Sequence, residues 1–178
     1  MNSKSPEELL DELDVVPRIL LTTDGTLTHI LEAYASEPVY LVKLAHAFVT
    51  GPAAQAEFDL DGQERAVRRV ILLRGARSDT AYLFADSVVM LDRLPPLVAA
   101  GLLETDTPIG KLLFSSRAET FRKITELGEQ QDPGVAAHFD MQPDEPLVYR
   151  TYQIVLDGQP IACITEKFPK ASFRSTEV

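Results

Sequence analysis

The segment VYRTYQIVLDGQPIACITEKF, residues 148–168, decides the fold of this chain. Asp157 and Gly158 lie at its centre and signal a two-residue turn, because glycine tolerates a positive φ and aspartate bonds its own backbone. The residues on both sides are rich in β-branched and aromatic types, which are typical of strands. The segment therefore predicts two antiparallel strands joined by a tight turn.

Glu166 is the unusual residue of the second of these strands. Successive side chains of a strand point to opposite faces. One face therefore carries Ala162, Ile164, Glu166 and Phe168. A carboxylate among apolar neighbours either has a partner or lies in a cavity that uses its charge. We therefore expect Glu166 to be paired or to belong to a ligand site.

A second informative strand is predicted for residues 67–74. One of its faces carries Val67, Arg69, Ile71 and Leu73. Because a guanidinium does not lose its charge, an inward Arg69 requires an anion, which is either a protein carboxylate or a ligand. Glu166 is one candidate, in a buried ion pair, and Asp86 on the strand predicted for 81–91 is another. The pattern alone supports an ion pair and a ligand site equally.

The remaining elements follow from caps, turn residues and periodicity. Strands are expected at 39–49, 67–74 and 81–91, and helices at 5–14, from about 26, at 94–103 and at 107–114. Pro17 is expected to break the chain after the first helix. Residues 55–62 fit a polar connection or a bulged strand, and residues 117–127 fit a helix or a strand.

The order of elements favours an α+β fold. Helices, strands, helices and strands follow one another without a repeated strand–helix–strand unit, which argues against a parallel sheet. The chain has 178 residues and an ordinary globular composition, with 45% hydrophobic residues. We therefore predict a single domain of residues 1–178, built on a mostly antiparallel sheet that is flanked by helices.

Composition excludes several classes of function. The net charge of −10 argues against nonspecific binding to nucleic acid, whose phosphates would be repelled. The apolar runs are too short for a membrane span, and the first residues lack the apolar core of a signal peptide, so we expect a cytoplasmic protein. The three histidines and one cysteine lack the spacing of metal ligands, so no metal site is expected.

Five segments in order resemble the chorismate lyases (chorismate–pyruvate lyases), in particular their archaeal and mycobacterial branch. They are DGTLTHIL (24–31), RRVILLRG (68–75), FADSVVMLDRLP (84–95), TPIGKLLFSS (107–116) and RTYQIVLDGQPIACITEKF (150–168). The resemblance implies an antiparallel sheet whose flanking helices close over an internal ligand site. It also implies conversion of the small molecule chorismate to 4-hydroxybenzoate and pyruvate, without a metal or organic cofactor.

The resemblance also implies roles for individual residues. Arg69 matches the arginine that binds the ring carboxylate, and Glu166 matches the glutamate near the ring hydroxyl. Leu27 and Ile109 match positions whose backbone groups line the pocket. A carboxylate held in an apolar setting suits a general acid or base, so the catalytic candidates are Glu166 and Arg69.

At one position the chain departs from the enteric-type lyases. Where they carry an arginine after a glycine on the third strand, this chain has Ala85 and Asp86. Asp86 is therefore retained as a candidate substrate contact. Arg150 and Arg117 are candidates for the missing cation.

A noncatalytic function is the alternative to the lyase. The effector-binding domains of one large class of bacterial transcription regulators share the fold, and they bind small molecules without turnover. Such regulators carry a winged helix-turn-helix ahead of the sensor, whereas only a short capped helix precedes the first matching segment here. We therefore favour the lyase and expect neither nucleic acid nor membrane as a partner. The sequence does not specify an oligomeric state.

Overall fold

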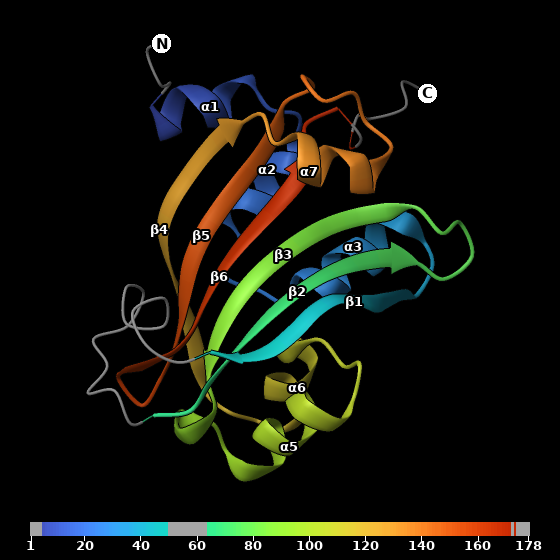
Figure 1. Ribbon diagram of the computed structural model, residues 1–178. Helices are drawn as coiled ribbons and strands as arrows, with labels where there is room; N and C mark the ends of the chain where they lie inside the picture. The colour runs from blue at the N-terminus through green and yellow to red at the C-terminus, as the bar shows by residue number, and fades with distance from the viewer. Residues whose placement is uncertain (1–4, 50–63, 172, 174–178) are drawn as a thin grey trace.

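The computed structural model describes residues 5–49, 64–171 and 173. A six-stranded sheet with the order β1-β2-β3-β6-β5-β4 forms its centre (Figure 1). The strands are β1 (Val39–Val49), β2 (Ala66–Gly75), β3 (Ala81–Met90), β4 (Thr120–Gln130), β5 (Leu147–Leu156) and β6 (Gln159–Pro169). All five neighbouring pairs are antiparallel, which confirms the predicted fold class. The segment predicted at 55–62 lies outside the described residues.

The predicted hairpin is formed by β5 and β6. Only Asp157 and Gly158 separate the two strands, and both have positive φ, 50° and 78°. Two positive φ values match the right-handed twist of the flanking strands, and Gly158 accepts this conformation without strain. The register is shifted by a bulge near Ile154, after which Arg150 lies directly opposite Glu166.

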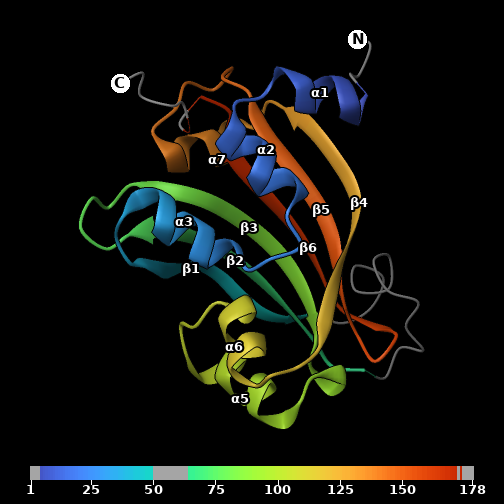
Figure 2. The same cartoon turned by 180° about the vertical axis from the view of Figure 1, so that it is seen from behind.

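Helices cover mainly one face of the sheet. They are α1 (Pro6–Glu12), α2 (Val15–Thr22), α3 (Leu27–Ala35), α5 (Pro96–Glu104), α6 (Ile109–Ser115) and α7 (Pro133–Ala136), with 3-10 turns η1 (Leu91–Arg93) and η2 (Ala137–Phe139). Figure 2 shows α2, α3 and α6 in front of the sheet, whereas α7 lies on the other face (Figure 1). The main core lies between the sheet and the helices on the face shown in Figure 2. It includes the fully buried Leu20, Leu31 and Leu102. None of the described helices is long and apolar enough to cross a bilayer.

Two local expectations need correction, and one ambiguity is resolved. Pro17 does not break the chain but lies in the first turn of α2, where backbone N–H groups have no intrahelical acceptor and proline costs nothing. The helix expected at 107–114 begins two residues later, because α6 starts at Ile109 with Pro108 as its N-cap. Residues 117–127 contribute to strand β4, not to a helix.

The sheet consists of two half-sheets that meet along a short seam. β1, β2 and β3 form the first half-sheet, and β6, β5 and β4 form the second. β3 and β6 pair through six residue pairs, from 84 with 167 to 89 with 162. The other neighbours pair through nine or ten. Figure 1 shows β3 and β6 side by side along this stretch and diverging beyond it.

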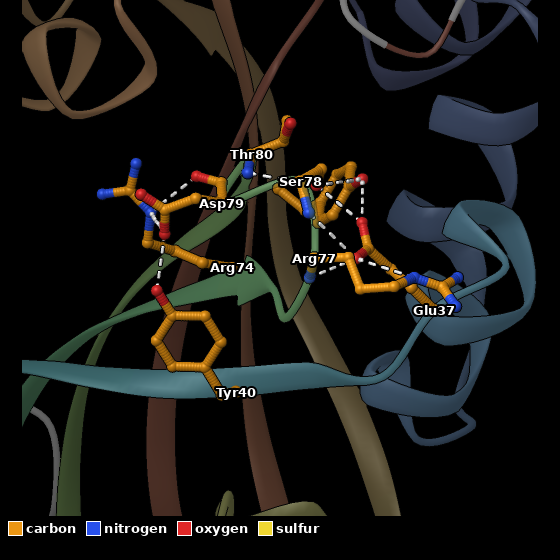
Figure 3. Close-up of polar contacts among 8 residues, drawn as sticks. Glu37, Tyr40, Arg74, Arg77, Ser78, Asp79 and Thr80 are labelled. Atoms are coloured by element: carbon orange, nitrogen blue, oxygen red, sulfur yellow. Dashed lines mark hydrogen bonds and ion pairs between the residues drawn. The ribbon is translucent and has the colours of Figure 1, made fainter.

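Glu37 attaches the end of α3 to the turn between β2 and β3 (Figure 3). Its buried carboxylate accepts hydrogen bonds from the backbone N–H groups of Arg77 (2.6 Å) and Ser78 (3.1 Å) and from the Ser78 hydroxyl (2.6 Å). The Ser78 hydroxyl and then the Arg77 amide lower the pKa of Glu37 below its ordinary value. The first turn of α3, at the opposite end of this helix, lies at the candidate site.

Candidate active site

A pocket lies between the sheet and the first turns of α3 and α6. Its space not filled by protein atoms measures about 570 Å³, including the part open to solvent. Its floor is formed by Arg69, Ile71, Leu73, Leu83, Ala85, Ser87, Tyr152, Ile154, Ile164 and Glu166, and its walls by residues 26–28, residues 108–110 and Arg122. The floor therefore crosses the seam between the half-sheets. The pocket brings together four of the residues matched by resemblance, Arg69, Glu166, Leu27 and Ile109.

Arg69 presents a buried cation to this pocket. The side chain is only 3% exposed, and its Nε and Nη2 have no hydrogen-bond partner among the described residues. Burial lowers the pKa of Arg69 below its ordinary value, while the carboxylate of Asp106 opposes this shift. An arginine remains charged even so, and a buried charge without a partner is costly. The pocket is therefore prepared for an anion at Arg69.

Glu166 belongs to a separate buried cluster at the other side of the pocket. Its Oε2 accepts a hydrogen bond from Arg150 Nε at 2.7 Å, and its Oε1 accepts one from the Tyr152 hydroxyl at 2.9 Å. Arg150 is the direct cross-strand neighbour of Glu166 and is fully buried. Glu166 therefore forms its ion pair with Arg150, and the expectation that it pairs with Arg69 is wrong.

The two donors of the cluster, Tyr152 and Arg150, each keep one protonation state. Burial and then the charge of Glu166 raise the pKa of Tyr152 far above its ordinary value. Burial is the largest single influence and alone would lower the pKa of Arg150, but the charges and hydrogen bonds of Glu166 and Tyr152 together outweigh it and the pKa is raised. Tyr152 thus stays a hydroxyl donor and Arg150 stays a cation throughout the range in which proteins are folded.

Asp86 does not reach the pocket. It lies on the opposite face of the sheet, where its Oδ1 accepts a hydrogen bond from Arg68 Nε at 2.9 Å. Ser87 is the β3 residue that shares the face of Arg69 and lies opposite it in the register. Alternation along β3 therefore excludes Asp86 both as the partner of Arg69 and as a contact for a ligand in this pocket.

Arg122 is a pocket residue that sequence reasoning missed. It lies on β4, its Nη1 donates to the backbone carbonyl of Asp24, and its guanidinium carbon lies 5.9 Å from the centre of the Tyr152 ring. Its Nε is buried and has no partner among the described residues. Because the sequence of residues 117–127 fits a helix as well as a strand, the face on which Arg122 lies cannot be predicted from it. As a strand, the segment places Arg122 on the same face as Ile124, a partly buried residue that packs against the core.

The two other arginine candidates differ in position. Arg150 lies behind Glu166, and its Nη1 also donates to the backbone carbonyl of Thr23 at 2.6 Å. Together with Arg122, it holds the loop of residues 23–24 that leads into α3. Arg117 is exposed at the end of α6 and is not among the pocket residues. Arg150 therefore orders the site, whereas Arg117 does not belong to it.

The arrangement suits a small anion with a hydroxyl group on the far side. Apolar side chains of the sheet form most of the floor, and a few polar groups converge on it, as in most small-molecule sites. Arg69 can bind a carboxylate through two parallel N–H groups. Glu166, on the other half-sheet, can accept a hydrogen bond from the hydroxyl group of such a ligand.

Comparisons with known proteins show which family this chain resembles. Residues 21–175 match the family model described as chorismate pyruvate-lyase Rv2949c-like. A Mycobacterium tuberculosis (strain H37Rv) protein named chorismate pyruvate-lyase is 31% identical over 161 residues, which cover 88% of this chain and 81% of that protein. A Mycobacterium leprae (strain TN) protein of the same name is 30% identical over 177 residues, which cover 98% and 84%.

Solved structures show how widely the fold is shared. The effector domain of PhnF from Mycobacterium smegmatis superposes with a TM-score of 0.65 at 13% identity, covering 85% of this chain and 93% of that one. The C-terminal domain of the histidine utilization repressor from Pseudomonas syringae gives a TM-score of 0.56 at 16% identity, covering 79% and 96%. At such identities the likeness concerns the fold alone.

Proposed function

Because this chain belongs to the Rv2949c-like chorismate pyruvate-lyase family, we propose that it converts chorismate to 4-hydroxybenzoate and pyruvate. The observation that carries this proposal is the buried guanidinium of Arg69, whose Nε and Nη2 have no partner among the described residues. A carboxylate on a planar ring supplies two oxygens in the geometry that such a guanidinium fits.

In this proposal, two groups on opposite sides of the substrate ring, a carboxylate and a hydroxyl, bind to the pocket. The ring carboxylate binds Arg69, near the backbone of Leu27 and Ile109 at the first positions of α3 and α6. The ring hydroxyl, on the carbon opposite the carboxylate, donates to Glu166. Because Arg69 and Glu166 belong to different half-sheets, the ring lies across the seam.

The reaction requires one proton transfer and no outside reagent. The ether bond between ring carbon C3 and the enolpyruvyl oxygen breaks, and the hydrogen on C4 leaves as a proton. The electron pair of that C–H bond completes the aromatic ring, and the enolpyruvate takes up a proton on its methylene carbon to become pyruvate. The gain of aromaticity drives the reaction, so holding one reactive conformer supplies much of the catalysis.

Within this proposal, Glu166 orients the substrate hydroxyl. Both of its oxygens already accept hydrogen bonds, from Arg150 and from Tyr152, so the carboxylate is fixed in position. A fixed acceptor holds the C4 hydroxyl in one direction and thereby holds the breaking bonds in line. Proton transfer by Glu166 is the alternative role.

Incubation of the purified protein with chorismate alone tests the function. We expect pyruvate and 4-hydroxybenzoate to appear in equal amounts as chorismate is consumed. Glu166→Gln keeps an acceptor at the site, so kcat is expected to fall by about 10- to 100-fold. Thr165→Ser, on the opposite face of β6, is the matched control and should retain full turnover.

Two results would decide against parts of this proposal. Binding of chorismate without release of pyruvate would identify the chain as a noncatalytic binding domain of the same fold. A loss of about 10⁴-fold in the Glu166→Gln variant, with KM unchanged, would assign proton transfer to Glu166 and contradict an orienting role.

A further inference from the structure

The pocket carries one more cation than a single carboxylate requires. Its described lining contains three charged side chains, Arg69, Arg122 and Glu166. Glu166 is neutralised from behind by Arg150. Neither Arg69 nor Arg122 forms an ion pair with a described residue, and each has a buried N–H without a partner. The site is therefore arranged for two negative charges in a protein whose net charge is −10.

We propose that Arg122 binds the second carboxylate of a dianionic substrate, the one on the enolpyruvyl side chain. This inference rests on the proposed function, because chorismate carries one carboxylate on the ring and one on the side chain. Arg69 and Arg122 then bind one carboxylate each. Arg122 takes the place of the cation that Ala85 and Asp86 do not supply on β3.

The position of Arg122 selects the side-chain carboxylate and not the ring carboxylate. Arg69, Ser87, Ile164 and Tyr152 form one transverse row across β2, β3, β6 and β5. Three strand spacings place the backbones of Arg69 and Tyr152 about 14 Å apart. Arg122 lies against the Tyr152 ring, at the far end of this row.

The substrate has the same order of groups. In chorismate the enolpyruvyl ether is attached to the ring carbon next to the hydroxyl, and the ring carboxylate is on the opposite side. A hydroxyl held by Glu166 therefore brings the side-chain carboxylate to the end of the pocket occupied by Tyr152 and Arg122. Arg122 is also close to the start of α6, since a methyl group built on Gly110 would lie 3.6 Å from its Nη2.

The other arginines do not fit this role. Arg150 already donates to Glu166 and to the carbonyl of Thr23, and it does not line the pocket. Arg117 is exposed beyond α6. The guanidinium of Arg122 is held in place by the carbonyl of Asp24, so its buried Nε is oriented before a ligand arrives.

Two ligands that differ in charge test the inference. Chorismate carries both carboxylates, whereas 4-hydroxybenzoate carries only the ring carboxylate. In Arg122→Gln, KM for chorismate is expected to rise about 10- to 100-fold, which is the value of a lost charge-assisted contact. The inhibition constant of 4-hydroxybenzoate should stay within about twofold of the wild type, since this ligand never reaches Arg122. Arg69→Gln should weaken both ligands, because both carry the ring carboxylate.

Two further variants separate binding from structure. Lys123→Gln removes a positive charge from the neighbouring, exposed position of β4 and should change neither constant. Arg122→Lys keeps the charge without the planar fork and should restore part of the affinity for chorismate. A thermal melt of each variant checks that the fold is retained, because the bond to Asp24 is lost as well.

The outcomes distinguish this inference from the proposed function. Suppose that the wild type converts chorismate. If Arg122→Gln then weakens the binding of both ligands equally, or of neither, the role of Arg122 is overturned and the lyase function stands. Failure of the wild type to bind or convert chorismate overturns the proposed function and this inference with it. A selective loss of chorismate supports both.

Discussion

Arg150 is the fully buried counter-ion of Glu166, and its removal tests how the site is held together. Arg150→Met leaves a buried carboxylate without its cation, so we expect the free energy of unfolding to fall by about 3–5 kcal/mol in urea titrations. Adding Glu166→Leu to this variant removes the uncompensated charge and should restore much of the loss. A cost below about 1 kcal/mol for the single variant would show that Glu166 does not depend on Arg150.

Alternation along single strands was sufficient to find Arg69 and Glu166, but it could not assign their partners. A two-residue turn at 157–158 without a bulge would place Arg150 opposite Thr165. The bulge near Ile154 shifts the register by one residue and brings Arg150 opposite Glu166. The ion pair depends on this bulge. Pro160, which has no N–H for the ladder, lies beside it and is a local signal of a bulge, but alternation along a single strand does not reveal the resulting shift in register.

At the scale of elements, Glu37 links α3 to the turn between β2 and β3, and this link should depend on pH. Hydrogen bonds lower the pKa of Glu37 below its ordinary value of 4.5 in the folded state. A lowered pKa contributes stability that is complete above the unfolded value and is lost as the pH falls through the folded one. The stability difference between wild type and Glu37→Gln should therefore be largest near pH 7 and shrink below about pH 4.5.

Urea unfolding of both proteins between pH 7 and pH 3 measures this difference. Ser78→Ala removes the donor that lowers the pKa of Glu37 most, so it should reduce the pH dependence without abolishing it. A difference between wild type and Glu37→Gln that is constant over this range would contradict the assigned role of the carboxylate.

The elements themselves were predictable to different degrees. The β5–β6 hairpin and the capped helix α1 follow from local chemistry, since Gly158 and the pair Ser5 and Glu8 fix their backbones directly. Strand β4 was ambiguous because it is the edge of the sheet, and residues such as Phe121 alternate with only half-buried neighbours. Arg122 was missed for this reason. The sequence does not predict helix α2, because a proline normally breaks a helix interior, whereas Pro17 lies in the first turn, where proline is tolerated.

The face of Asp86 shows a different limit of the sequence. Within β3, the alternating set that contains Asp86 is as apolar as the set that contains Ala85 and Ser87. The pairing of β3 with both β2 and β6 decides which set faces the helices. The orientation of β3 therefore depends on the pairing of the whole sheet and cannot be predicted from one strand alone.

At the scale of the whole molecule, an acidic protein encloses a cationic pocket, and a matching anion should stabilise it. With 4-hydroxybenzoate at about 100 times its dissociation constant, the free energy of unfolding should rise by about 2.7 kcal/mol, measured by thermal or urea unfolding. The uncharged 4-hydroxybenzamide at the same concentration is the matched control and should have little effect. Arg69→Gln should lose the stabilisation, and an unchanged shift in this variant would contradict the assignment of the ring carboxylate.

The six-pair seam between β3 and β6 also has a consequence for how such a scaffold can change over time. A small rotation about this joint widens or narrows the space between Arg69 and Glu166 while every ladder inside each half-sheet is preserved. A few substitutions at residues 84–89 or 162–167 could therefore readjust the cavity to molecules of another length, without a new core having to be assembled.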